Sequence, residues 1–461
     1  MTGIPTDRLA TLDDAIRGGV FAPETDGFDE ARRLWNARAS GRPAAVVRPS
    51  GTADVLEAVR FADAVDRPVT AKGGGHHVAG IAIGDGAIAL DFGDMDGVRV
   101  DPSLERVHVG PGATWGQVDH ETQAFGMAVP GGQDPNIGVA GLTLGGGVGW
   151  LSRRYGLTCD ALVGADVVTA AGRLRRASDA DNPDLFWGLR GGGGALGVVT
   201  SFSFDLHDLG TSVIAGSLMF PHEELARVLE HYRWAMAEAP RALRLMAGSM
   251  VLPDSDYYPP TIRGRRAAML IGCYAGDPDD GRRALRPLRE RATPALDSFR
   301  ERSYLGWQRA GTSVGRRRTH VRSQYVASIT APVVDALVEA AAHAPTDGAT
   351  VFVSPRGGAE ADPAPTATAF PHRTEAHHVL AEARWDGPAL DAEHVAWTEA
   401  VAERLAPHTT GEVAFNFLTA DEPPERVRAA FGPNYGRLVD LKTTWDPANR
   451  LRMNPFIEAR R

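Results

Sequence analysis

Four runs of glycine in the first half of the chain constrain its fold more than any other feature. They lie at Lys72-Gly73-Gly74-Gly75-His76-His77-Val78-Ala79-Gly80, at Gly131-Gly132, at 138–149 and at 191–194, in a chain of 461 residues that has 52 glycines. Glycine runs let backbone N–H groups converge on a phosphate without obstruction by side chains. Several such loops predict a long ligand with a pyrophosphate, such as a dinucleotide; tight turns between strands are the simpler alternative.

Two common nucleotide-binding patterns do not account for these runs. The Rossmann fingerprint requires GxGxxG between a strand and a helix, with an acidic residue about 20 positions later. After Gly75 the chain continues with two histidines and then Ala79-Gly80-Ile81-Ala82-Ile83-Gly84, which is a poor start for a helix. The Walker pattern GxxxxGK[ST] does not occur in the sequence. We therefore expect a different nucleotide-binding architecture.

Composition and charge exclude several classes of function. The net charge is -9, from 49 basic and 58 acidic residues, so a basic field for nucleic acid or anionic lipid is not expected. Two cysteines, Cys159 and Cys273, cannot form a disulfide framework or a zinc cluster, and we expect no metal ion. No apolar stretch approaches the roughly 18 residues of a membrane-spanning helix. These features predict a soluble, cytoplasmic protein that binds neither nucleic acid nor membranes.

Hydrophobic periodicity predicts an α+β fold in two parts. Short β-like runs separated by Gly, Pro and Asp occupy much of residues 44–170, after a helix expected over 29–39. From about residue 208 the pattern changes to long strands and amphipathic helices, which predicts an antiparallel sheet with helices covering one side. In this part we expect strands at 212–219, 267–274 and 412–417, and helices at 221–238, 279–291, 331–342, 391–405, 424–431 and 437–445.

Five strings together carry a resemblance to a known family. They are AKGGGHHVAG, VAGLTLGGGVGWLSRRYGLTCD, NPDLFWGLRGGGGALGVVTSFSFDLH, ATAFPHR and NYGRLVDLKTTWDPANRLRMNPF, and they extend from about residue 30 to 457. In this order they resemble the flavin-linked oxidases of the vanillyl-alcohol-oxidase type, specifically the berberine-bridge-enzyme-like branch. The resemblance implies an N-terminal helical segment (1–39), an FAD-binding domain (40–207), an inserted substrate-binding domain (208–411) and a C-terminal segment (412–461) that returns to the FAD domain.

The resemblance also implies covalently bound FAD. Members of the branch attach the 8α-methyl carbon of the flavin to the first histidine after the triple glycine, which is His76 here. A subset makes a second bond from C6 of the flavin to a cysteine, for which the LTCD string offers Cys159. An electron-poor flavin ring accepts attack by a neutral imidazole or a thiolate. The other residues implied to bind the cofactor are Lys72, Gly73, Gly74, Gly75, His77, Gly80, Gly131, Ile137, Gly138, Gly141, Leu142, Gly145, Gly146, Gly147, Gly149, Val198, Val199, Asn416 and Asn454.

The acid–base group that acts on the substrate departs from the family pattern. Many relatives use a tyrosine in a Tyr-x-Asn-Tyr string, but the matching stretch here is Glu412-Val413-Ala414-Phe415-Asn416-Phe417. Phenylalanine cannot accept a proton, so the usual base is absent. Tyr155, Tyr325, His372 and Tyr435 are the candidates that replace it, with Tyr304 and His320 as further alternatives. A substrate that needs no strong base, such as a phenol or an amine, also fits.

Together these features predict an FAD-dependent oxidase that takes a hydride from a bulky natural-product substrate, with molecular oxygen reoxidising the flavin to give hydrogen peroxide. A carbohydrate oxidase is one alternative. A flavoprotein that binds a ligand without turnover is another, and a dehydrogenase that uses a different acceptor is a further variant. The oligomeric state is left open.

Overall fold

The computed structural model describes residues 4–310, 315–374 and 376–460 and has three main sheets. The first sheet has the order β1-β2-β4-β3, in which β4 is parallel to both β2 and β3. Helices α1 and α3 cover it with an apolar face, as their shared core with the strands shows. The bounds of this first part are α1 Thr6–Ala15, β1 Gly19–Phe21, α2 Phe28–Ala31, β2 Ala45–Arg48, α3 Thr52–Ala64, β3 Val69–Lys72 and β4 Ile88–Asp91.

The second sheet is antiparallel, with the order β5-β6-β10-β8-β9. Its buried face packs with α4 and α7 in one core, which also takes in side chains from the C-terminal helices α13 and α14. The bounds of this part are β5 Val98–Asp101, β6 Arg106–Val109, α4 Trp115–Gln123, β7 Met127–Ala128, α5 Val139–Leu144, α6 Ser152–Tyr155, β8 Leu162–Val168, β9 Leu174–Ala177, α7 Pro183–Leu189, β10 Val198–Asp205 and β11 His207–Asp208.

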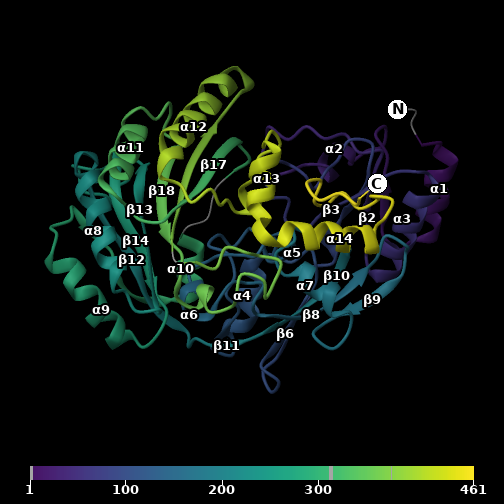
Figure 1. Ribbon diagram of the computed structural model, residues 1–461, viewed down its shortest axis with the longest axis horizontal. Helices are drawn as coiled ribbons and strands as arrows, with labels where there is room; N and C mark the ends of the chain where they lie inside the picture. Colours follow the sequence, from purple (N-terminus) through teal and green to yellow (C-terminus); the bar gives the residue numbers. More distant parts are fainter. Residues whose placement is uncertain (1–3, 311–314, 375, 461) are drawn as a thin grey trace.

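The third and largest sheet is antiparallel, with the order β15-β12-β14-β13-β18-β19-β17, and β16 pairs with β12 at its edge. Apolar side chains on one face of this sheet form a core with α8, α9, α11 and α12, which lie on its outer side in Figure 1. The bounds are β12 Ser212–Pro221, α8 Leu225–Ala237, β13 Leu243–Val251, β14 Arg266–Tyr274, α9 Pro278–Glu290, β15 Leu296–Asp297, β16 Arg300–Ser303, α10 Tyr304–Ala310, β17 Arg318–Val326, α11 Ala331–Ala342, β18 Ala349–Pro355, β19 His377–Trp385 and α12 Asp391–Leu405.

The C-terminal segment returns to the first two sheets. Helices α13 (Pro424–Phe431) and α14 (Tyr435–Trp445) cross the middle of the molecule in Figure 1, and α14 contacts α7. The chain after α14 then runs beside β3, where the Val69 N–H donates to the Arg450 carbonyl at 2.7 Å and the Arg452 N–H donates to the Val69 carbonyl at 2.8 Å. The predicted α+β class with antiparallel sheets is confirmed; the exact domain boundaries stay a prediction.

Two predicted elements are wrong. The helix expected over 29–39 ends after one turn, because the buried Asn36 side chain instead donates to the carbonyls of Val78 (2.7 Å) and Thr319 (3.0 Å). The strand expected over 412–417 is a 3₁₀ turn at Phe415–Phe417. In this turn Phe415 is buried against Phe431 and Phe456, and Asn416 points to the opposite side, toward Gly145. In both segments contacts with distant residues override the local pattern.

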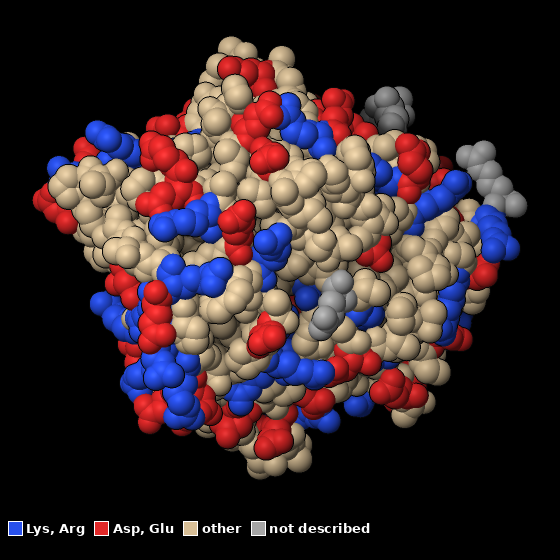
Figure 2. Space-filling model, turned by 60° about the vertical axis from the view of Figure 1, so that its left-hand side comes forward, with Lys and Arg blue, Asp and Glu red and all other residues tan. Residues whose placement is uncertain are grey.

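Charges of both signs are mixed over the face of the molecule that Figure 2 presents. Figure 2 shows Lys and Arg interspersed with Asp and Glu across the face that it presents, without a continuous field of one sign. Within the described ranges, none of the helices combines the length and apolar character that crossing a bilayer requires.

Candidate active site

The glycine runs meet in space through direct backbone contact. A Cβ atom on Gly74 would collide with the backbone nitrogen of Gly138, and a Cβ on Gly138 would collide with the Gly74 nitrogen. The third run joins the fourth through Gly193, whose N–H donates to the Leu144 carbonyl at 2.8 Å. Side chains larger than hydrogen at Gly74 or Gly138 would therefore push the two loops apart.

The C-terminal segment closes this glycine-rich region. Asn416 packs so closely on Gly145 that a Cβ there would occupy the position of its amide oxygen. Asn454 donates to the Gly192 carbonyl at 3.0 Å and accepts the Phe456 N–H at 3.0 Å. Val198 and Val199 are buried at the start of β10. Asn416 and Asn454 thus tie two predicted cofactor loops to the end of the chain.

His76 presents one ring nitrogen without a partner. Its Nδ1 lies 3.3 Å from the Gly74 carbonyl, which can only accept, so Nδ1 carries the proton and Nε2 keeps its lone pair. Nε2 is buried and has no hydrogen-bond partner among the described residues. The ring stacks on Trp35 at 5.1 Å, and burial lowers the pKa of His76, which keeps the imidazole neutral. A neutral imidazole with a free lone pair is the nucleophile that attachment to a flavin methyl group requires.

His77 has a different environment, although it is the next residue. Its Nδ1 accepts the Ala79 N–H at 3.2 Å, and its Nε2 donates to the Phe415 carbonyl at 3.2 Å. Burial lowers the pKa of His77 to about 4. Both ring nitrogens are thus occupied, and His77 joins the glycine loop to the C-terminal 3₁₀ turn. Lys72 is also engaged: its ammonium donates to the Ala31 carbonyl at 2.8 Å and pairs with Asp91 at 3.1 Å.

Cys159 is completely buried. It packs with Leu157 and Phe370, and its N–H donates to the Gly146 carbonyl at 2.8 Å. Burial, together with the nearby Asp160, raises the pKa of its thiol well above the usual range, so the thiol stays protonated at neutral pH. The thiolate that a second flavin bond requires is therefore not favoured at this position, and that bond stays a prediction.

The predicted base candidates do not gather in one place. Tyr155 stacks on His207, and its hydroxyl donates to the Asp208 carbonyl at 2.7 Å. Tyr435 packs against Phe431 at the start of α14. Of the predicted residues, Tyr325 and His372 lie together, with ring centroids 5.5 Å apart.

His372 is held by two acceptors. Its Nε2 lies 3.1 Å from the Ala430 carbonyl and its Nδ1 lies 3.4 Å from the Glu412 carboxylate. The ring thereby links the segment after the third sheet to α13. His372 thus contributes to holding α13 against the rest of the site.

The structure adds His378, which the sequence analysis did not select. On β19, Val379, Ala381 and Ala383 point into the core beneath the helices, so His378 lies on the opposite face. It is half-buried and lies 5.0 Å from the ring of Phe417 and 5.2 Å from that of Tyr325. Its Nε2 lies 2.7 Å from the Ser323 hydroxyl. Strand alternation over 377–385 was the signal that could have identified it.

Burial, with the charged side chains beneath this face, sets the protonation of His378 and Tyr325. Arg244 and Arg356 are buried and both pair with Glu360, at 2.8 and 3.0 Å. Burial, together with the two guanidinium groups, lowers the pKa of His378 to about 3. Burial also raises the pKa of Tyr325. At neutral pH this face therefore presents a neutral imidazole beside a protonated phenol.

A second buried polar cluster lies behind Gly132. Gln308 donates from its amide to both the Asp119 carboxyl (2.8 Å) and the Gly132 carbonyl (2.9 Å). Complete burial raises the pKa of Asp119 to about 7, although the hydrogen bond from Gln308 opposes the shift. Asp119 is therefore protonated in the folded protein below about pH 7.

Replacing Asp119 by Asn is expected to change how stability depends on pH. Between about pH 4 and pH 7 the folded protein holds a proton on Asp119 that the unfolded chain has lost, so the free energy of unfolding falls as pH rises. One such proton contributes a slope of about 1.4 kcal/mol per pH unit. The difference between wild type and D119N in chemical unfolding should show this slope between pH 4 and 7 and level off above it. A difference that does not change with pH would contradict the assignment.

The residues gathered here fit an FAD cofactor, since the glycine runs come together beside His76, which offers an unbonded nitrogen. Comparison with known proteins agrees. The family model described as FAD binding domain matches residues 43–178, and the model described as berberine and berberine like matches residues 415–458. The (R)-6-hydroxynicotine oxidase of Paenarthrobacter nicotinovorans is 30% identical over 458 residues, which cover 96% of this chain and 97% of that protein.

Solved structures share the fold over almost the whole chain. The berberine bridge enzyme of Eschscholzia californica has a TM-score of 0.85 with 20% identity, covering 96% of this chain and 97% of that one. A xylooligosaccharide oxidase from Myceliophthora thermophila, solved with xylobiose, has a TM-score of 0.86 with 22% identity, covering 99% of each chain.

Proposed function

Since the chain belongs to the berberine-bridge-enzyme-like family of FAD-linked oxidoreductases, we propose that it oxidises a bulky aromatic natural product through FAD bound covalently to His76. The observation that carries the attachment is the buried Nε2 lone pair of His76 at the meeting point of the glycine runs. Oxygen is the proposed acceptor: the two electrons and two protons removed from each substrate molecule reduce one O₂ to hydrogen peroxide.

The residues of the site would have the following roles. FAD, when bound, supplies the group that accepts a hydride from the substrate carbon. The glycine loops offer backbone N–H groups to its phosphates, and His76 Nε2 holds its ring through one bond. His77 and Asn416 keep the C-terminal 3₁₀ turn against these loops. Cys159 as a second attachment is the weaker part of the proposal, because its thiol is buried and protonated.

The substrate would contact the face of the third sheet that carries Tyr325, His378 and Phe417. These rings suit an aromatic substrate, and Phe417 leaves the site without the hydroxyl that many relatives have. Among the described residues no hydrogen bond engages Nδ1 of His378, so this nitrogen is free for a substrate hydroxyl or amine. A phenol or amine substrate gives up a proton more readily than an aliphatic alcohol, so it needs less help from a strong base.

Anaerobic titration of the purified flavoprotein tests the function. The panel contains simple phenols, aromatic tertiary amines, (R)-6-hydroxynicotine and xylobiose. We expect an aromatic member to bleach the flavin absorbance, which then returns in air with one hydrogen peroxide per turnover. Bleaching by xylobiose alone would favour a carbohydrate oxidase. Bleaching by none of them would favour a non-catalytic flavoprotein, and slow recolouring in air would favour a dehydrogenase.

Replacing His378 by Leu is expected to slow flavin reduction by the bleaching substrate about two- to tenfold, because a hydrogen bond between neutral groups is lost; such a bond contributes about 0.5–1.5 kcal/mol. Since the pKa of His378 is about 3, its titration should leave the rate unchanged between pH 5 and 9. His377→Gln is the matched control, because His377 points to the other face and contacts the Tyr232 hydroxyl at 2.9 Å. Equal rates in H378L and H377Q would remove His378 from the site.

A further inference from the structure

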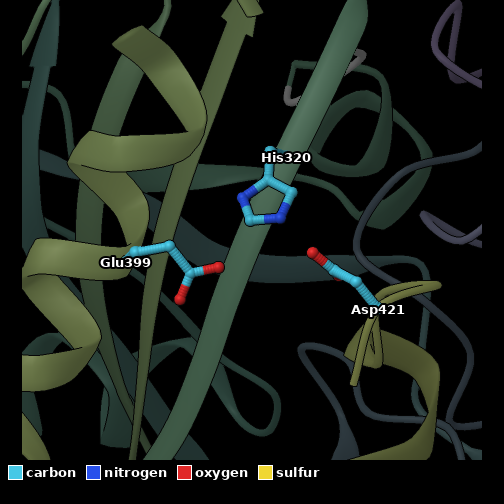
Figure 3. A group of neighbouring side chains, drawn as sticks. All are labelled: His320, Glu399 and Asp421. Atoms are coloured by element: carbon cyan, nitrogen blue, oxygen red, sulfur yellow. The ribbon is translucent and has the colours of Figure 1, made fainter. Parts of the chain in front are cut away.

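Three side chains of metal-ligand type meet on the helix-covered side of the third sheet. His320 comes from β17, Glu399 from α12, and Asp421 from the segment between the 415–417 turn and α13. Their ligand atoms all lie within 4.8 Å of one another, and Figure 3 shows the imidazole between the two carboxylates. Because even-numbered residues of β17 face α12, this cluster is separate from the candidate active site, which uses Ser323 and Tyr325 on the other face.

The hydrogen bonds of His320 fix the tautomer that binds metal ions. The Thr398 hydroxyl donates to the Val395 carbonyl at 2.8 Å, so its oxygen accepts from Nδ1 of His320 at 2.6 Å. The proton therefore lies on Nδ1, and Nε2 keeps a lone pair. A hydrogen bond from the ring nitrogen that is not a ligand is the usual way in which proteins orient a metal-binding histidine.

Nε2 of His320 has no partner among the described residues, although His320 is only 2% exposed. In Figure 3 this nitrogen faces the Asp421 carboxylate, so two hydrogen-bond acceptors point at each other. A cation or a water molecule is required between them.

Arginine side chains partly neutralise the carboxylates of the cluster. Glu399, Asp421 and Glu422 are three carboxylates, and Arg322 pairs with all of them, with Asp421 only at 3.7 Å. Arg426 pairs with Glu422 at 2.6 Å, and Arg38 pairs with Asp391 at 4.0 Å. Three carboxylates against Arg322 and Arg426 leave one negative charge, which Arg38 opposes because its partner Asp391 also pairs with Arg318. Asp421 is the carboxylate that Arg322 reaches least, and it is 63% exposed, which gives an ion a path from solvent.

We propose that His320, Glu399 and Asp421 bind one divalent transition-metal ion, with water completing its coordination. An imidazole with two carboxylates suits Zn²⁺ or Mn²⁺ better than Mg²⁺ or Ca²⁺, which prefer ligand sets made only of oxygen. Such an ion would join β17, α12 and the segment that follows Phe415-Asn416-Phe417. It would therefore stabilise the turn that holds Asn416 against the glycine loops, without taking part in the oxidation itself.

The test uses untagged, full-length flavoprotein freed of metal by a chelator and dialysis. Titration calorimetry with Zn²⁺ should show one equivalent bound, at least tenfold more tightly than Mg²⁺, and bound Zn²⁺ should raise the melting temperature. His320→Asn and Asp421→Asn should each weaken binding at least tenfold. His343→Asn, which removes an exposed histidine elsewhere, is the control and should bind like wild type.

Each outcome decides the proposal. Asp421 is exposed, so D421N is expected to fold even where H320N does not, and far-UV circular dichroism checks both. Absence of one-to-one Zn²⁺ binding by wild type would overturn the proposal. So would unchanged binding in a folded D421N variant, because the metal would then lie elsewhere. In either case a water molecule hydrogen-bonded between His320 and Asp421 would account for the unpartnered Nε2 of His320.

Discussion

The His76→Ala variant is expected to carry no flavin after precipitation with trichloroacetic acid, whereas wild type gives a yellow pellet. The reason is that His76 Nε2 is the buried nitrogen that has a free lone pair, while both nitrogens of His77 are engaged. Intact-mass spectrometry should find the mass of one FAD on wild type and none on H76A. This is the largest effect that we expect of a single substitution on the cofactor.

The matched variant is Cys159→Ala, which removes the other predicted attachment. A buried, protonated thiol is a poor nucleophile, so we expect C159A to keep its flavin through acid precipitation. A yellow acid pellet from H76A would show an attachment elsewhere, and loss of that colour in the double variant would assign it to Cys159. Free release of flavin from the wild-type protein by acid would contradict covalent attachment altogether.

Local periodicity was a reliable guide where a helix has one apolar face. The predicted helices 331–342, 391–405 and 424–431 match α11, α12 and α13 at both ends. In each the apolar side chains recur at helical spacing and pack on a sheet or core. The segments 29–39 and 412–417 failed because Asn36 and Phe415 are placed by contacts with residues far away in the sequence, which a local pattern does not contain.

The same division applies to the candidate site. The triple glycine that precedes His76 in the sequence also lies next to it in space, so a local string was enough to select this residue; its role as the attachment site stays a prediction. No local string selects His378 or the cluster of His320, Glu399 and Asp421, since each depends on which strands pair and which helix covers them. The sequence analysis included His320 among the possible bases and expected no metal ion. His320 lies on the face of β17 that packs against α12, whereas the candidate active site uses the opposite face of the same strand.

The largest expected loss of stability comes from a buried ion pair in the C-terminal helix. Lys442 and Asp446 are both completely buried, with their charged atoms 2.6 Å apart. The ammonium also donates to the carbonyls of Ala195 and Leu451, at 2.9 and 2.7 Å. The Asp446 carboxylate accepts the N–H groups of Arg450 and Leu451, both at 2.8 Å. This pair therefore holds α14, the chain that follows it and the fourth glycine run together.

Replacing Asp446 by Asn should lower the free energy of unfolding by about 3–5 kcal/mol, because it leaves the Lys442 ammonium buried without a counter-charge. Asp440→Asn, on the same helix, is the matched control: Asp440 pairs with Arg460 at 2.6 Å in an exposed position, where such pairs contribute about 0–1 kcal/mol. The midpoints of urea unfolding of the flavoprotein compare the two. A double variant, Lys442→Met with Asp446→Asn, separates two causes of the lost stability. If the double variant is more stable than D446N, the unpaired Lys442 charge caused the loss. If it is less stable still, the hydrogen bonds that Lys442 makes to Ala195 and Leu451 matter more.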